Sequence, residues 1–191
     1  MLFRSEIARV AYFGANLPAG ESLGLTHSET YDPLSVAFAY ASHACLVEVD
    51  PETGVVEVLK YAVVHDCGTM VNPLLIEGQI HGGIAQGLGG ALTEEFRYNA
   101  QGQLLSDSLN QYHLPLAAGI PPIQVEHLET PSPRVPGGFK GSGEGGTIGS
   151  TAAIVNAVAD ALAPFGVSVT ATPLTPDRIW NLIHKARSAT F

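Results

Sequence analysis

The sequence predicts a domain of the α+β class, in which a β-hairpin packs against a long glycine-rich helix and helices near the C-terminus. Three segments lead to this prediction: two alternating runs around a turn, a helical segment rich in glycine, and an alanine-rich stretch at residues 148–163. Of the 191 residues, 46% are hydrophobic, so the chain can bury a sizeable core.

The β-hairpin is predicted around residues 51–54. Residues 46–50 alternate between apolar and polar side chains, the period of a half-buried strand. The next four residues place Pro51 early and Gly54 late, as turns favour. A second β run follows over residues 55–66, so we expect antiparallel pairing with the first run, which covers residues 36–50.

A long helix, or two consecutive ones, is predicted over residues 74–97. Asn72 and Pro73 favour a helix start, since proline is tolerated in the first turn. The segment contains six interior glycines, at 78, 82, 83, 87, 89 and 90. Each costs about 0.5–1 kcal/mol relative to alanine. Close packing against a sheet or the approach of a cofactor could offset that cost.

The rest of the chain supplies shorter elements. We predict a turn at residues 99–102, strands at 103–106 and 123–129, a buried helix at 148–163, and a helix that begins at Thr175-Pro176 and runs to about residue 185. The domain itself is expected to span residues 36–187. Residues 1–35 are interpreted as a remnant of a preceding domain or linker, and residues 188–191 as a tail.

Composition excludes several functional classes. The formal charge of −9 and the absence of a basic run disfavour binding to nucleic acid or an anionic membrane. Two cysteines make no disulfide framework and fit a reducing compartment. No apolar run approaches the ~20 residues that cross a bilayer, and the N-terminus lacks a secretory signal. We therefore expect a cytoplasmic protein.

The loop at residues 137–149 holds the most informative carboxylate. Glu144 stands among glycines just before a predicted helix, so bare backbone could seat a large flat ligand with the carboxylate pointing at it. Burial there would raise the pKa of Glu144 and suit it as a general base. Alternatively, Glu144 is an acid favoured by the helix macrodipole, an interpretation that spacing alone slightly favours.

Other motifs are weak. Residues 141–146 satisfy G-x-G-x-x-G, but a proline-rich loop precedes them where a dinucleotide fold needs a strand. The pairs His43/Cys45 and His65/Cys67 suggest zinc. The expected register, however, sets His43 opposite Ala62, Cys45 opposite Lys60 and His65 opposite Tyr40, which separates the two histidines by about 10 Å. No metal site is therefore predicted, and no G-x-S-x-G elbow is present.

Three segments in order, residues 64–73, 76–89 and 140–144, resemble the xanthine dehydrogenase/aldehyde oxidase family of molybdenum hydroxylases. Within that family, bacterial large subunits of the carbon monoxide dehydrogenase type look nearest. The resemblance implies the C-terminal part of a molybdopterin-binding subunit, with a second molybdopterin-binding domain type of fold. Gln79 matches a glutamine that hydrogen-bonds the pterin. Glu144 matches the glutamate beside molybdenum, and Gly141, Ser142 and Gly143 would let the backbone close on the cofactor.

The resemblance further implies oxidation of an aldehyde, N-heterocycle or similar small substrate with water-derived oxygen, Glu144 taking the proton. The implied cofactor is molybdenum-molybdopterin in its cytosine dinucleotide form. FAD and [2Fe-2S] clusters would belong to partner subunits, an FAD subunit and an iron–sulfur subunit. By the same resemblance, the family's other cofactor loops lie upstream of this sequence, so we expect a fragment, or else a naturally split subunit, that is inactive without the N-terminal part of the subunit. The alternative is a non-catalytic cofactor-binding or assembly module.

Overall fold

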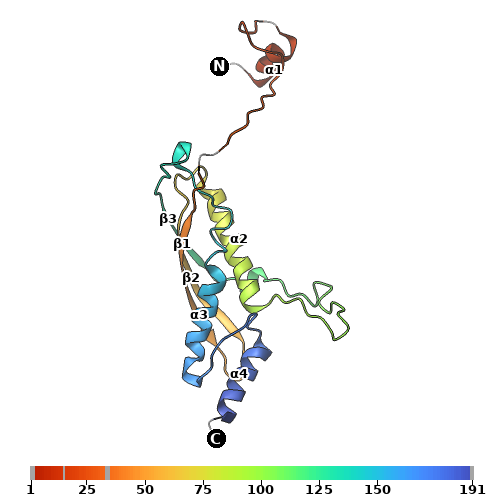
Figure 1. Ribbon diagram of the computed structural model, residues 1–191, viewed down its shortest axis with the longest axis vertical. Helices are drawn as coiled ribbons and strands as arrows, with labels where there is room; N and C mark the ends of the chain where they lie inside the picture. The colour runs from red at the N-terminus through yellow and green to blue at the C-terminus, as the bar shows by residue number, and fades with distance from the viewer. Residues whose placement is uncertain (1–2, 15, 33–34, 190–191) are drawn as a thin grey trace. The chain divides into compact units, whose positions relative to one another are not determined.

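The computed structural model describes residues 3–14, 16–32 and 35–189, which fall into two compact units, Met1–Pro33 and Leu34–Phe191 (Figure 1). The first unit contains helix α1 (Arg4–Phe13), which the sequence did not predict and which ends at Gly14 in the left-handed conformation. Positions 1–2, 15 and 33–34 of the expected remnant, and 190–191 of the expected tail, lie outside the described residues. Among the described helices, none is both long and apolar enough to cross a membrane.

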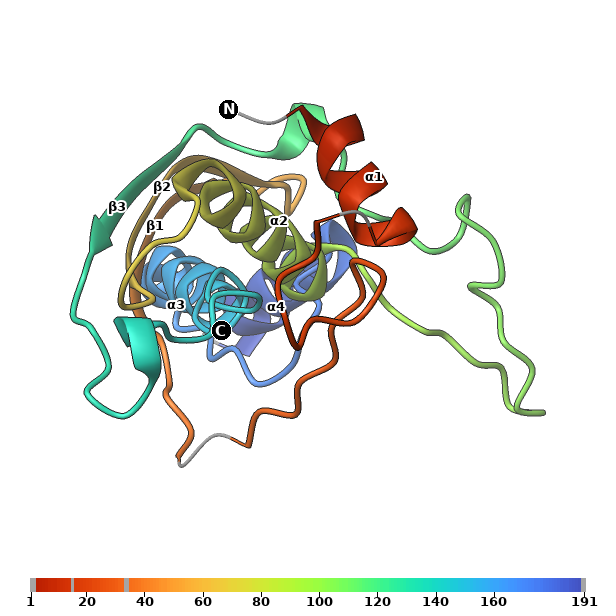
Figure 2. The same ribbon diagram turned by 90° about the horizontal axis from the view of Figure 1, so that it is seen from above.

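The second unit is a three-stranded mixed sheet with helices on one face, which confirms the α+β class (Figure 2). The strands lie in the order β1-β2-β3, the first pair antiparallel and the second parallel. Its elements are β1 (Tyr40–Val49), β2 (Val56–Asp66), α2 (Pro73–Leu92), β3 (Ile123–Leu128), α3 (Ser150–Leu162) and α4 (Pro176–Ala189), with short 3-10 turns η1 (Ala117–Gly119), η2 (Pro136–Gly138) and η3 (Ala163–Phe165).

The hairpin is confirmed, but its register differs from the prediction. At the turn, the Asp50 carboxylate accepts the N–H of Glu52 at 2.9 Å and the hydroxyl of Thr53 at 2.7 Å. Pairing then runs as expected until a β-bulge, where the ladder steps from Val47↔Val58 to Leu46↔Lys60. The extra residue shifts every later pair by one, because a bulge sets two residues opposite one.

Helix α2 provides much of the core. The Asn72 side chain caps it by accepting the Leu75 N–H at 3.4 Å, with Pro73 in the first turn, as predicted. The helix is single and ends at Leu92, five residues short of the predicted 97. Its buried stripe recurs every fourth residue and packs with β2, α3 and α4; on α2 it comprises Ile76, Ile80, Ile84 and Leu88.

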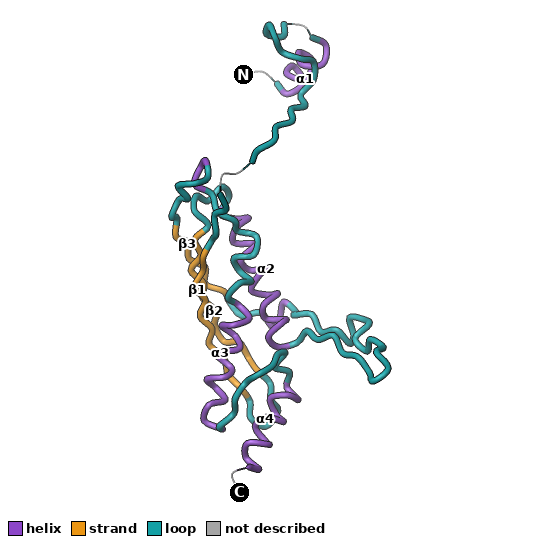
Figure 3. The backbone as a smooth tube through the Cα atoms, viewed as in Figure 1, coloured by secondary structure: helices purple, strands orange, loops and turns teal. Residues whose placement is uncertain are grey.

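The segment after α2 projects from the body of the unit as a loop (Figure 3). The predicted turn at residues 99–102 is present, with Asn99 Oδ1 accepting the N–H groups of Gln101 and Gln103. The predicted strand at 103–106 was wrong, since only an isolated bridge joins Tyr98 and Leu104. A lone pair of extended segments with no third strand beside it rarely forms a stable sheet.

The later elements follow the predictions closely. The strand expected at 123–129 is β3, the helix expected at 148–163 is α3, and the helix beginning at Thr175-Pro176 is α4. The parallel pairing of β3 with β2 was not predicted. It brings the far end of β3 beside the end of β2, next to the loop that carries Glu144.

Candidate functional site

The glycine-rich loop before α3 lies directly against helix α2. A Cβ built at Gly146 would stand 2.3 Å from the Ile80 carbonyl oxygen, and one built at Gly83 would stand 2.7 Å from the Thr147 nitrogen. The Thr147 hydroxyl donates to the Gly83 carbonyl at 3.3 Å, and Ser150 Oγ, which donates to the Thr147 carbonyl at 3.1 Å, lies 3.5 Å from the same Gly83 oxygen. Close packing between helix and loop therefore accounts for part of the glycine content of α2.

This packing brings the predicted site residues together. A Cβ built at Gly143 would lie 3.9 Å from Gln79 Nε2, so the middle of the loop faces the predicted pterin-binding glutamine. Gly78 and Gly82, which flank Gln79 on α2, have nothing within 4 Å of a built Cβ, and the same is true of Gly141. The side chains of Gln79 and Glu144 are both exposed. Open backbone therefore lies near Gln79 on α2 and at Gly141, three residues before Glu144.

Glu144 does not have the environment expected for it. Its side chain is exposed, so the predicted burial was wrong for this chain. The next two residues are buried instead, because Gly145 packs against His65 and Gly146 against Ile80. The Glu144 carbonyl accepts the N–H groups of Thr147 and Ile148, at 2.9 and 3.1 Å, which forms a tight turn. The macrodipole interpretation fails as well, since α3 begins only at Ser150 and has no acid in its first turn.

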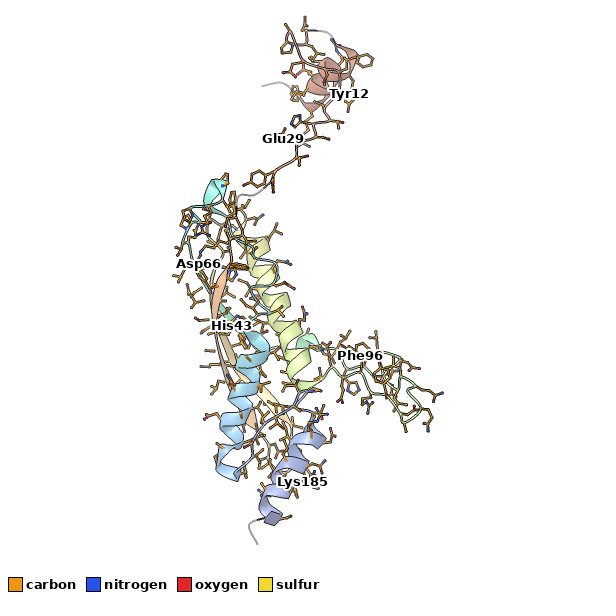
Figure 4. All side chains as sticks on the ribbon, viewed as in Figure 1. Tyr12, Glu29, His43, Asp66, Phe96 and Lys185 are labelled. Carbon is orange, nitrogen blue, oxygen red and sulfur yellow. The ribbon has the colours of Figure 1, made fainter. Side chains whose placement is uncertain are left out.

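A buried ion pair that sequence reasoning missed anchors the start of this loop. Lys140 Nζ lies 3.1 Å from Asp66 Oδ1, and the side chains are only 5% and 4% exposed. Lys140 also donates to the Tyr40 hydroxyl at 3.0 Å. Both members of the pair stand in segments that carry the family resemblance, but a single sequence gives no signal that joins positions 74 apart. Figure 4 labels Asp66 on the sheet.

Hydrogen bonds set the charge state of Asp66. Burial acts to raise its pKa, but hydrogen-bond donors lower the pKa by more. These donors are the Thr130 side chain and backbone, the Gly68 N–H and Lys140. The pKa of Asp66 therefore lies well below its ordinary value. Because the pKa is lower in the folded state, the ionised carboxylate stabilises the fold at pH values above the unfolded pKa of about 3.9. This contribution is lost as pH falls through the folded pKa.

Asp66→Asn is expected to lower the free energy of unfolding at pH 7, because it leaves Lys140 buried without its counter-charge. The difference in free energy of unfolding between the variant and the parent should narrow as pH falls below about 4, because the parent then begins to lose the stabilisation from the ionised Asp66 carboxylate. Urea denaturation of the chain between pH 7 and pH 3 measures both effects. The matched control is Glu52→Gln, in an exposed pair with Arg187 at 3.7 Å, which should change stability by less than about 1 kcal/mol. Equal effects of the two variants would contradict the anchoring role.

The His and Cys pairs do not gather around one point. In the observed register His43 pairs with Val63 and His65 with Ala41, which corrects the predicted partners Ala62 and Tyr40. Cys45 lies opposite Tyr61 instead of Lys60. Burial raises the pKa of the Cys45 thiol to about 11. Within residues 3–14, 16–32 and 35–189, no three His, Cys, Asp or Glu side chains form a group that could hold a metal ion.

Sequence reasoning also missed a concave surface elsewhere on the unit. A groove of about 920 Å³ opens where the end of α2 meets the start of β2, the projecting loop and the start of α4. Its lining is largely apolar and includes Leu88, Leu92 and Val58. None of the predicted site residues contributes to it, so the groove is separate from the Gln79–Glu144 surface.

The family model described as "Molybdopterin cofactor-binding domain" matches residues 4–121. The large subunit of nicotine 6-hydroxylase from Paenarthrobacter nicotinovorans is 40% identical over 176 residues, 92% of this chain and 22% of that protein. The carbon monoxide dehydrogenase large chain of Hydrogenophaga pseudoflava is 39% identical over 177 residues, 93% of this chain and 22% of that protein.

Two solved structures are also similar to this chain. Quinoline 2-oxidoreductase from Pseudomonas putida 86 matches 97% of this chain and 24% of its own, with a TM-score of 0.83 and 43% identity. Carbon monoxide dehydrogenase from Oligotropha carboxidovorans matches 96% of this chain and 23% of its own, with a TM-score of 0.84 and 32% identity. The chain thus spans less than a quarter of the length of these relatives. It belongs to the molybdopterin cofactor-binding domain family, within the molybdenum hydroxylases.

Proposed function

We propose that this chain forms the C-terminal part of the molybdopterin-binding subunit of a molybdenum hydroxylase, with Glu144 as the catalytic base. One observation carries the proposal: Gly143, the residue directly before Glu144, lies beside Gln79, and the side chains of Gln79 and Glu144 are both exposed. In this proposal, the amide of Gln79 on α2 and the carboxylate of Glu144 in the loop face one ligand.

The residues present fit a large flat cofactor. Gly78, Gly82 and Gly141 leave open the positions that a Cβ would fill, so a ring system can approach the backbone closely. The exposed Gln79 amide has both a donor and an acceptor to offer a pterin edge. We propose that Gly141, Ser142 and Gly143 complete the binding surface through their backbone groups.

Glu144 would act on a proton. When bound, the molybdenum cofactor supplies a metal that activates water-derived oxygen and accepts the electrons of the oxidation. Glu144 would accept the proton released in that activation at a carboxylate oxygen, as a general base within hydrogen-bond reach. Because the side chain is exposed here, the remainder of the subunit would have to cover it and exclude water.

The substrate, in this proposal, is a small molecule such as an aldehyde or N-heterocycle. The names of two relatives, nicotine 6-hydroxylase and quinoline 2-oxidoreductase, support an N-heterocycle. The cofactor would be the cytosine dinucleotide form, and electrons would leave through an iron–sulfur subunit and an FAD subunit, all in the cytoplasm. A relative described as subunit gamma of a dehydrogenase complex supports a multi-subunit assembly.

The test uses the complete enzyme, produced with its partner subunits in a host that makes molybdenum cofactor. We expect stoichiometric molybdenum and oxidation of members of an aldehyde and N-heterocycle panel, with ¹⁸O from labelled water in the product. Molybdenum without oxidation of any panel compound would favour the non-catalytic module instead.

Gln79→Ala should weaken retention of the cofactor by about tenfold, the loss of a hydrogen bond of roughly 1–1.5 kcal/mol. Molybdenum and pterin content after gel filtration measures it. Gln86→Ala is the matched control, because Gln86 is also exposed on α2 but lies two turns away. Equal retention by the two variants would remove Gln79 from the cofactor site.

A further inference from the structure

A row of polar side chains crosses the face of the sheet that the helices cover. On β2, His65 pairs with His127 of β3, and their ring centroids are 6.3 Å apart. On β1, His43 lies opposite Val63, two residues from His65, and its Nδ1 is 2.9 Å from the Tyr61 hydroxyl. Figure 4 labels His43 on the sheet. The row is unusual because the rest of this face is apolar.

Most ring nitrogens of this row have no hydrogen-bond partner in the described part of the chain. His65 is 0% exposed, and neither of its ring nitrogens has a hydrogen-bond partner in the described part of the chain. The same holds for Nε2 of His43 and for both ring nitrogens of His127. Burial lowers the pKa of His65, and the neighbouring His127 and His43 lower it further against the opposing effect of Asp66. His65 is therefore a neutral, buried ring that the proposed chemistry does not use.

The loop that carries Glu144 rests on these rings. A Cβ built at Gly145 would stand 2.1 Å from His65 Nε2, and its three nearest heavy atoms all belong to that ring. At Gly149 a Cβ would stand 2.4 Å from Cδ2 of His43. Neither glycine has a positive φ, so an alanine fits the backbone conformation at both positions. The absent side chain, rather than an unusual backbone, is what allows each contact.

We infer that His65 is a positioning residue for Glu144. Its ring contacts the backbone at Gly145, the residue directly after Glu144. This contact limits how closely the turn can pack against the sheet. The buried ring has few alternative positions, since His127 and His43 lie along the same row. This inference rests on the proposed role of Glu144, because positioning matters only if that carboxylate acts on a bound substrate or cofactor.

A double-mutant cycle in the complete enzyme tests the contact. Gly145→Ala alone should lower kcat by about 10- to 100-fold, the consequence of displacing a reacting group by about 1 Å. KM should change by less than about threefold, because substrate contacts remain. His65→Ala added to Gly145→Ala opens space for the new methyl and should restore kcat by about tenfold or more. Adding His113→Ala, an exposed histidine in the projecting loop, should restore nothing.

A second readout does not depend on turnover. In the cofactor-free complete enzyme, hydrogen–deuterium exchange across residues 141–149 should be faster in His65→Ala than in the parent. His65→Gln, which keeps a neutral polar side chain of similar reach, should exchange like the parent. If Gly145→Ala fails to fold, the exchange rates of the two His65 variants and the parent test the positioning role of His65 by themselves.

Two results would overturn the inference: no rescue by His65→Ala, or equal exchange in His65→Ala, His65→Gln and the parent. A different result would contradict the proposed function. Full activity of Glu144→Gln would remove the catalytic role, and the exchange experiment would still show whether His65 holds the loop.

Discussion

Glu144→Gln is expected to lower kcat by about 10²- to 10⁴-fold, the range lost when a general base is removed. The amide keeps the size and the hydrogen-bonding capacity of the side chain but cannot accept the proton. The substitution should also preserve the loop, because the turn depends on the Glu144 carbonyl, which accepts from Thr147 and Ile148. Turnover of the best panel substrate and molybdenum content, measured on the same preparation, separate loss of chemistry from loss of cofactor.

Glu126→Gln provides the matched control. Glu126 is an exposed glutamate on β3, so the same chemical change should leave turnover within about twofold, as for a surface substitution without partners. Parent-like turnover in Glu144→Gln would show that Glu144 is not the base. A parallel loss of molybdenum would instead assign Glu144 a role in binding the cofactor.

Gly83→Ala is expected to destabilise the fold by about 1–3 kcal/mol, the usual cost of inserting a methyl where no space exists. Its Cβ would stand 2.7 Å from the Thr147 nitrogen and 2.8 Å from the Gly146 carbonyl carbon. Both are backbone atoms, which cannot move aside without displacing the loop that precedes α3. The gain in helix propensity is therefore outweighed by the clash.

Gly82→Ala, one residue earlier, should have the opposite effect. Nothing lies within 4 Å of a Cβ built there, so alanine should stabilise the helix by about 0.5–1 kcal/mol. Urea denaturation of the two variants beside the parent makes the comparison directly. Two changes of the same sign would contradict the close approach of α2 to the loop at residue 83.

Only part of the candidate site could be predicted from the sequence. Resemblance selected Gln79 and Glu144, and the structure places the Glu144 loop beside Gln79. Sequence reasoning could not find that the glycines at 145 and 149 accommodate His65 and His43, because those contacts join residues far apart in the chain. It also expected Glu144 to be buried, since a glycine-flanked acid gives no sign of which side of the loop faces the core.

The sequence by itself determined the elements that local chemistry specifies: the hairpin with its turn at Asp50, the Asn72-Pro73 start of α2, and the approximate limits of β3, α3 and α4. Only the tertiary structure decided the bulge between Leu46 and Val47, the parallel pairing of β3 with β2, and the Lys140–Asp66 pair that anchors the loop. Turns and helix starts depend on neighbours within a few residues, and the sequence displays those directly. Register, strand order and buried charge depend on packing between distant segments, whose energies no local pattern records.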